Sequence, residues 1–169
     1  MVAKFIISIK DKKLQALLTK ADKKTRNLTP VFEGPIRRSI AVAMERQFTS
    51  RGSFFGTPWA PLRPFTLAQR RKRGRGKQGD APLRDTDRLF RSITRVTDPE
   101  GIRVSGPSSL RWGTRVPYAY KHQVGFTSEL FGREVEVPAR PMLPETAWPP
   151  EVRKQWVEAI IRHVKPKGL

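Results

Sequence analysis

Three aspartates in the middle of the chain form a cluster whose residue types could perform chemistry. Asp80, Asp85 and Asp87 fall within eight residues, and arginines alternate with them. Carboxylates are the hard oxygen ligands that magnesium prefers, and neighbouring arginines could hold a phosphate, as in a metal-dependent nuclease. Metal ligands, however, usually converge from separate elements. We therefore favour a local role, in which Asp85 or Thr86 caps the helix that follows.

A basic run precedes these aspartates. If it binds phosphates, it contacts nucleic acid without sequence preference, and its affinity falls as salt rises. A solvated charged loop is the alternative. The whole chain carries 34 Lys and Arg against 15 Asp and Glu, and we expect an anionic neighbour, either nucleic acid or an acidic protein surface, to offset this formal charge of +19. The run consists of Arg70, Arg71, Lys72, Arg73, Arg75 and Lys77.

The composition excludes several kinds of catalytic and metal site. There is no cysteine, so disulfides, thiolate zinc sites and thiol nucleophiles are excluded. His122 and His163 are the two histidines, 41 positions apart, which excludes a histidine-rich metal site within one chain. A general base at His122 would need a nucleophile and an orienting acid, and the spacing identifies neither. We expect a partly buried His122 with both ring nitrogens hydrogen-bonded, no cofactor, no metal and no enzymatic activity.

Membrane insertion is not expected from the apolar segments. The longest uninterrupted apolar runs, such as residues 5–7, are far too short to span a bilayer. Lysines flank this run closely, so no signal peptide is expected.

Four tryptophans could stack on the bases of a single-stranded nucleic acid. The spacing favours other roles, because Trp156 belongs to a helical stripe and is expected in the core. Trp59 and Trp148 lie beside prolines, where a large aromatic side chain pins an irregular segment or anchors a subunit contact.

The elements that must position these residues mix helices and strands. Apolar spacing of three or four predicts helices over residues 11–27, 35–49, 87–93 and 150–164. Thr29-Pro30 is a further helix-start signal, so the second helix either kinks at Pro35 or begins there, and we favour a start at residue 35. Short β-branched or alternating segments predict strands at residues 4–9, 92–98, 101–106 and 133–138, the second and third joined as a hairpin by the turn at 98–101. We therefore expect one α+β domain over residues 1–169, with a small antiparallel sheet packed against two or three amphipathic helices.

A long segment between the helices lacks any periodicity. Residues 50–88 are rich in glycine, proline and basic residues, which predicts a long basic loop. The segment also contains Phe54, Phe55, Trp59, Leu62 and Phe65, and disordered linkers avoid such residues. Part of it must therefore pack on something, and a loop of this length is expected to be functional or bound to a partner.

Four segments in a fixed order resemble the phage virion morphogenesis family, also called tail completion proteins. They are GTPWAPL (56–62, with Thr66 after it), LRDTDRLFRSI (83–93), VPYAYKHQVG (116–125) and VPARPML (137–143), and the predicted C-terminal helix follows them. The resemblance covers about residues 50–145. One departure concerns the second segment, where the family has threonine-glycine before arginine-leucine and this chain has Thr86-Asp87. A glycine that permits unusual backbone angles is absent there.

The resemblance implies a non-enzymatic virion component, made in the host cytoplasm, that acts at the neck where heads and tails join. It implies rings of copies around the genome path, contacts with head-connector and tail proteins, and possible non-specific contact between the basic run and duplex DNA in the channel. It also implies structural roles for three groups of residues. Trp59, Pro61 and Leu62 would anchor the long loop, Tyr118, His122, Gln123 and Gly125 would shape a turn, and Pro138, Arg140 and Pro141 would fix the exit of the last strand.

Overall fold

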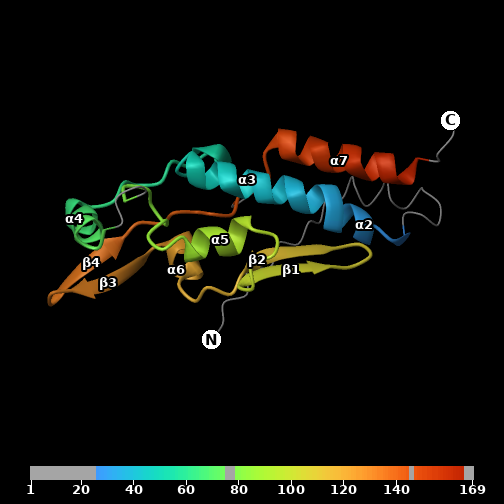
Figure 1. Cartoon of the computed structure of the whole chain (residues 1–169). Coiled ribbons are helices and arrows are strands. Elements are labelled where there is room, and N and C mark those ends of the chain that lie inside the picture. Colours follow the sequence, from blue (N-terminus) through green and yellow to red (C-terminus); the bar gives the residue numbers. More distant parts are fainter. Residues whose placement is uncertain (1–25, 75–78, 145–146, 166–169) are drawn as a thin grey trace.

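A computed structural model of the chain describes residues 26–74, 79–144 and 147–165. It shows an α+β fold with two separate two-stranded antiparallel sheets, where the sequence led us to expect one sheet (Figure 1). The strand predicted at residues 4–9 and nearly all of the helix predicted from Asp11 lie outside the described residues.

The central helix begins earlier than the sequence predicts. Helix α2 (Thr29–Val31) runs through a π-helical turn, η2 (Phe32–Ile36), directly into α3 (Arg37–Thr49). Pro35 lacks the N–H of a regular helical residue and its ring would clash with the preceding turn. The wider turn accommodates Pro35, and the backbone N–H of Arg37 bonds to the Phe32 carbonyl five residues back. The prediction that this helix starts at residue 35 is therefore wrong.

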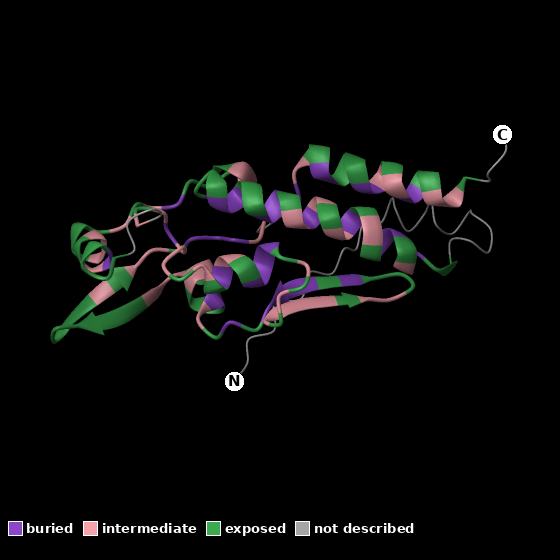
Figure 2. Cartoon of the chain, in the orientation of Figure 1, coloured by how far each residue is buried: buried purple, intermediate pink, exposed green. Residues whose placement is uncertain are grey.

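The C-terminal helix has the predicted bounds. Helix α7 (Pro150–Val164) lies along α3, and its stripe of Val152, Trp156 and Ile160 is buried (Figures 1 and 2). Trp148, just before the helix, packs against Trp156 with ring centroids 5.0 Å apart. The prediction that Trp156 lies in the core is confirmed.

The opposite side of α3 is covered by α5 (Arg88–Thr94), and α5 in turn packs on the first hairpin. Strands β1 (Gly101–Ser105) and β2 (Leu110–Thr114) pair antiparallel, with Gly101 opposite Thr114. The strand predicted over residues 92–98 is wrong, because its first residues are the last turn of α5 and β1 pairs with β2 instead. Trp112 of β2 is fully buried between the hairpin and α5.

Arg103 closes the C-terminal end of α5. Its guanidinium donates to the carbonyls of Ser92 (2.8 Å), Ile93 (2.9 Å) and Arg95 (3.1 Å), and lies 3.6 Å from the centre of the Trp112 ring. Burial, followed by the charge of Arg37, lowers its pKa to about 10, so it remains charged at neutral pH. A charged donor at these carbonyls satisfies groups that a helix end leaves unpaired.

The segment at residues 50–88 is not a long loop. It contains a short 3₁₀ turn, η3 (Ser53–Phe55), and a helix, α4 (Pro64–Lys72), which includes the first half of the basic run. The proline at the first position of α4 is a helix-start signal that the basic composition obscured. The prediction of a long basic loop is therefore corrected.

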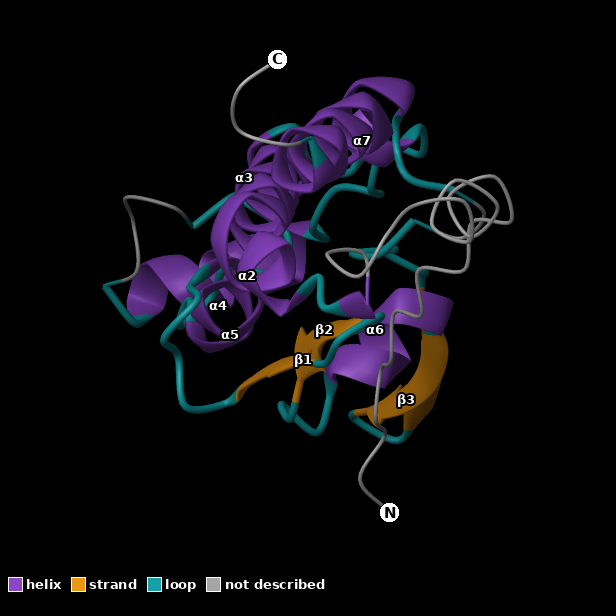
Figure 3. Ribbon diagram, turned by 90° about the vertical axis from the view of Figure 1, so that its right-hand side faces the viewer, coloured by secondary structure: helices purple, strands orange, loops and turns teal. Residues whose placement is uncertain are grey.

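The remaining elements lie at the α4 end of the molecule. Helix α6 (Ala119–Val124) leads through Gly125 into strands β3 (Phe126–Leu130) and β4 (Arg133–Val137), which pair antiparallel. The strand predicted at residues 133–138 is confirmed as β4. Figure 3 shows α3 and α7 on one side of the molecule and both hairpins on the other. No helix in the described part of the chain is long and apolar enough to cross a membrane.

Candidate functional site

The chain between β4 and α7 is the centre of the candidate site. The carbonyl oxygen of Pro141 accepts a hydrogen bond from Gln47 Nε2 of α3 (2.8 Å) and another from Trp59 Nε1 (2.9 Å). Trp59 is buried and packs edge-on against Phe48, with ring centroids 5.3 Å apart. One carbonyl thus ties the central helix to the segment before α4.

Arg140 makes the second connection between the same segments. Its buried guanidinium donates to the carbonyls of Ala60 (3.1 Å) and Pro61 (3.3 Å), and its backbone N–H donates to the His122 carbonyl (2.7 Å). Burial, followed by the charge of Arg70, lowers the pKa of Arg140. Segments that lie about 80 positions apart in the sequence are therefore held by one side chain.

Gln123 and Gly125 fix the course of the chain after α6. Gln123 Oε1 accepts from the backbone N–H groups of Met142 (2.8 Å) and Leu143 (3.1 Å), and its Nε2 donates to the Leu143 carbonyl (3.1 Å). Gly125 has φ +80°, and a Cβ atom there would lie 2.9 Å from the backbone nitrogen of Ala139. Only glycine meets both the left-handed angle and the close approach.

His122 lies between two aromatic rings. Its ring centroid is 5.9 Å from Tyr118 and 5.5 Å from Phe126, both nearly perpendicular to it. Burial, followed by the charge of Arg140, lowers the pKa of His122, which favours the neutral imidazole. Its Nδ1 is buried and has no hydrogen-bond partner among the described residues. The expectation that both ring nitrogens are hydrogen-bonded is therefore wrong.

The aspartate cluster is divided among three arginines. Each carboxylate contacts a different guanidinium, and no group of residues able to hold a metal ion is found in the parts of the chain that the structure describes. The three aspartates therefore do not converge as magnesium ligands. The pairs are Arg51–Asp80 at 2.6 Å, Arg70–Asp85 at 3.5 Å and Arg84–Asp87 at 2.9 Å.

The start of α5 departs from the predicted cap. Asp87 precedes the first helical residue with φ +58°, the left-handed angle that glycine adopts most easily. Its side chain accepts two hydrogen bonds from Arg84, at 2.9 and 3.0 Å, and makes no capping bond. The Thr86 hydroxyl accepts from the Arg88 N–H at 3.4 Å. Asp87 thus adopts a backbone angle suited to glycine, at the position where the family that this sequence resembles usually has glycine.

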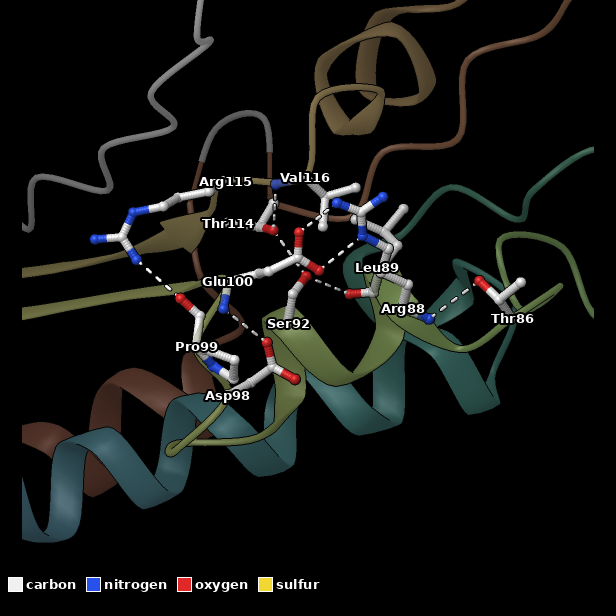
Figure 4. A network of polar contacts seen from close by, with 10 residues as sticks. All are labelled: Thr86, Arg88, Leu89, Ser92, Asp98, Pro99, Glu100, Thr114, Arg115 and Val116. Atoms are coloured by element: carbon white, nitrogen blue, oxygen red, sulfur yellow. Dashed lines mark hydrogen bonds and ion pairs between the residues drawn. The ribbon is translucent and has the colours of Figure 1, made fainter.

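A polar network joins the start of α5 to the first hairpin (Figure 4). Arg88 donates to both carboxylate oxygens of Glu100, at 2.8 and 2.5 Å, which lowers the pKa of Glu100. Beside this pair, the hydroxyls of Ser92 and Thr114 lie 2.7 Å apart in the core, and Thr114 also accepts from the Val116 N–H at 3.1 Å. Residues 83–93 and 116–125, the second and third of the four segments that resemble the family, therefore meet around these hydroxyls.

A pocket of about 960 Å³ opens beside these junctions, between α4, the start of α5, α6 and the second hairpin. Its walls combine apolar side chains with arginines, including Arg63, whose Nη2 donates to the Glu136 carbonyl at 3.0 Å. Asp85 and Glu136 also line it, so charges of both signs border the pocket, and the lining is suited to binding a mainly apolar group. The predicted site residues that line it are Pro61, Leu62, Arg70, Tyr118, His122, Pro138 and Arg140.

The basic run is split by the structure. Arg70 is buried on α4 and donates to the carbonyls of Gly79 (3.2 Å) and Ala81 (2.8 Å), so it is not placed as a phosphate contact. Arg71, Lys72 and Arg73 are exposed at the C-terminal end of α4. The remaining two basic residues, Arg75 and Lys77, lie outside the described residues.

Gln47 is a part of this site that the sequence reasoning missed. It is buried on the apolar face of α3 between Met44 and Phe48, and its Oε1 also accepts from the Phe55 N–H at 2.9 Å. An amide on an apolar stripe was the available signal, because a buried polar group needs partners.

Comparison with known proteins supplies one finding about the family. A family model described as the phage virion morphogenesis family matches residues 9–165. Comparison with curated proteins and with solved structures gave no significant match.

Proposed function

The chain belongs to the phage virion morphogenesis family, and we propose that it is a structural subunit that completes the tail and joins it to the head. The observation that carries the proposal is the extent of the family match, which covers residues 9–165 of 169. The protein is a phage virion morphogenesis protein. Its position at the neck is what we propose.

In this proposal, copies of the chain form a ring around the path of the DNA and contact head-connector and tail proteins. The net charge of +19 supports a position close to the genome, because a channel lined by positive charge attracts a polyanion. Copies are made in the host cytoplasm and become part of the virion.

The bonding of the candidate site supports a mechanical role. Arg140, Gln123 and Trp59 direct their polar groups to backbone groups of other segments, and their hydrogen bonds fix segments far apart in the sequence. A subunit that transmits contacts between head and tail needs rigid connections of this kind. No cofactor and no catalytic step enters the proposal.

Particle assembly without the protein tests the proposed joining role. A phage whose gene for this chain is interrupted should produce filled heads and separate tails in electron micrographs, and the intact gene supplied in trans should restore joined virions. Normal joined virions in its absence would reject the proposal.

Non-specific DNA binding is the second candidate function, favoured by the exposed Arg71, Lys72 and Arg73. Each phosphate contact contributes roughly 0.9 to the slope of log affinity against log salt. The triple variant R71Q/K72Q/R73Q should therefore lower that slope by up to roughly 2.7 for duplex DNA.

A matched control removes the same charge elsewhere. R91Q/R95Q/R111Q changes three exposed arginines of α5, its C-terminal flank and β2. If only the α4 variant loses affinity while it still self-associates as the original chain does, and loss of virion joining follows loss of affinity, DNA binding is the main function. If joining survives without DNA affinity, the structural role stands.

A further inference from the structure

The second hairpin projects from one end of the molecule as a largely exposed ribbon (Figures 1 and 2). Successive side chains of a strand point to opposite faces. Phe126, Ser128 and Leu130 of β3, with Val135 and Val137 of β4, line the pocket and define the inner face.

The outer face of this ribbon carries three glutamates. Thr127 and Glu129 of β3 lie opposite Glu136 and Glu134 of β4, respectively, and all four residues are exposed. Two carboxylates directly opposite each other on one face destabilise a strand pair. Within the described residues none of these glutamates forms an ion pair, so the ribbon in isolation leaves their repulsion uncompensated.

The tip of the ribbon exposes an aromatic pair. Phe131 is 81% exposed at φ +54°, an angle at which a two-residue hairpin turn favours asparagine or glycine. Its ring meets Phe65 of α4 edge-on, with centroids 5.6 Å apart, and Phe65 is itself 45% exposed. An exposed phenylalanine at an unfavourable angle indicates a contact that buries it.

The complementary charge is found on the same chain but on a different surface. Arg71, Lys72 and Arg73 are exposed at the end of α4. Helix α4 and the inner face of the ribbon line the same pocket, and Glu136 borders that pocket too, where its backbone carbonyl accepts from Arg63. Glu129 and Glu134 do not line the pocket and lie on the face turned away from α4 of their own chain. The α4 end of a second copy is not fixed on the pocket side of the hairpin, so it can contact the glutamate face.

We propose that the outer face of the second hairpin docks on the C-terminal end of α4 of a second copy, with Phe131 and Phe65 covered at the edge of the contact. The inference rests on the proposed ring and names the contact between its subunits. Two different patches meet in this contact, which is the heterologous arrangement that closes rings by rotation. Ion pairs at this contact weaken as salt rises.

A charge exchange tests the contact directly. In E129R/E134R the hairpin and α4 are both basic, and in R71E/R73E both are acidic, so each variant alone should self-associate at least roughly tenfold more weakly than the original chain. An equimolar mixture should regain association, because each hairpin then meets an α4 end of opposite charge. Sedimentation velocity measures this, and thermal unfolding checks that each variant is folded.

A matched variant and a cross-link complete the test. R91E/R95E makes the same charge change on α5 and its flank and should leave association unchanged. Because the chain has no cysteine, Glu134→Cys in one copy and Arg71→Cys in a tagged copy should form a mixed disulfide on oxidation, whereas Glu134→Cys with Arg111→Cys should not.

The proposal is overturned if the mixture of swapped variants stays monomeric, or if no mixed disulfide forms. It is also overturned if R71E/R73E loses only duplex DNA binding, or if E129R/E134R self-associates normally but no longer joins heads to tails. Failure of the joining role is seen separately, as normal virions in the absence of the protein.

Discussion

The imidazole of His122 is surrounded by Tyr118, Phe126 and Arg140, and this setting makes its protonation costly. Its pKa in the folded chain is lowered by burial, so the unfolded chain binds the proton first as the pH falls. The stability conferred by the neutral ring is present above about pH 6.5, the ordinary histidine value, and is lost as the pH falls from there through the lowered folded pKa. We expect the melting temperature to fall with acidification in this window.

Thermal unfolding between about pH 7.5 and 5.5, above the range in which most carboxylates titrate, measures this effect. His122→Gln should flatten the pH dependence. An equal pH dependence in the original chain and in His122→Gln would contradict the assignment.

Arg103 is the residue for which shape matters as much as charge. Its planar guanidinium reaches three carbonyls at the end of α5 and stacks on Trp112, which the single ammonium of lysine does not reproduce. We expect Arg103→Lys to lower the free energy of unfolding by about 2–3 kcal/mol, measured by urea denaturation. Arg111→Lys, exposed on the partner strand, is the control and should change it by less than about 0.5 kcal/mol. Equal effects would show that Arg103 acts only through its charge.

The hydrogen-bond partners of Gln47 and Trp59 could not be predicted from the sequence. Their common partner is the Pro141 carbonyl, 94 and 82 positions away, respectively. The aromatic residues of this segment, and the proline beside Trp59, predicted that large side chains anchor it, but a hydrogen bond to a distant backbone group has no local pattern. His122 illustrates the reverse, since its burial was predicted and its unpaired Nδ1 was not.

Among the elements, α7 was predicted with its bounds because one apolar stripe and its flanking prolines agree. Residues 92 and 93 were predicted both as the end of a helix and as the start of a strand, and side-chain bonds to the backbone decide their state. The Ser92 hydroxyl bonds to the Leu89 carbonyl and Arg103 caps the last turn, which holds these residues in α5. Helix α4 was missed because its apolar face is narrow and basic residues dominate its composition.

The start of α5 depends on an aspartate in a backbone conformation suited to glycine. Asp87→Gly removes the strain at φ +58° but also removes the two hydrogen bonds from Arg84, so the changes oppose each other. We expect the free energy of unfolding to stay within about 0.5 kcal/mol of the original. Asp87→Ala loses the bonds and keeps the strain, and should cost about 1–2 kcal/mol.

Urea denaturation of the two variants, with Asp98→Ala as a control at the turn before β1, measures this difference. If alanine and glycine at position 87 are equally destabilising, the backbone angle contributes nothing. If glycine is much the worse of the two, its greater conformational freedom in the unfolded chain outweighs the strain that it relieves.

For the whole molecule, the order of four short segments pointed to the virion family before any contact was known. The structure then places three of these segments against one another, through Arg140 with the WAPL stretch and Gln123 with Met142 and Leu143. The partner surfaces could not be predicted in the same way. The repulsion between glutamates of the second hairpin can be recognised only from the strand pairing, which puts Glu129 opposite Glu134.

The excess of positive charge should make salt a stabilising agent for the isolated chain. With a net charge of +19, repulsion between cations extends across the molecule at low ionic strength, where the screening length is about 30 Å at 0.01 M. Raising NaCl to about 0.15 M shortens that length to about 8 Å. Exposed pairs such as Arg51–Asp80 and Arg88–Glu100 are weakened by the same salt, but they are local and few compared with the repulsive contacts.

We therefore expect the melting temperature to rise over this range, and to rise less in R71Q/R73Q/R91Q/R95Q, which removes four positive charges from exposed sites. A melting temperature that falls as NaCl is added would mean that the ion pairs, and not the net charge, govern the electrostatic stability of the subunit.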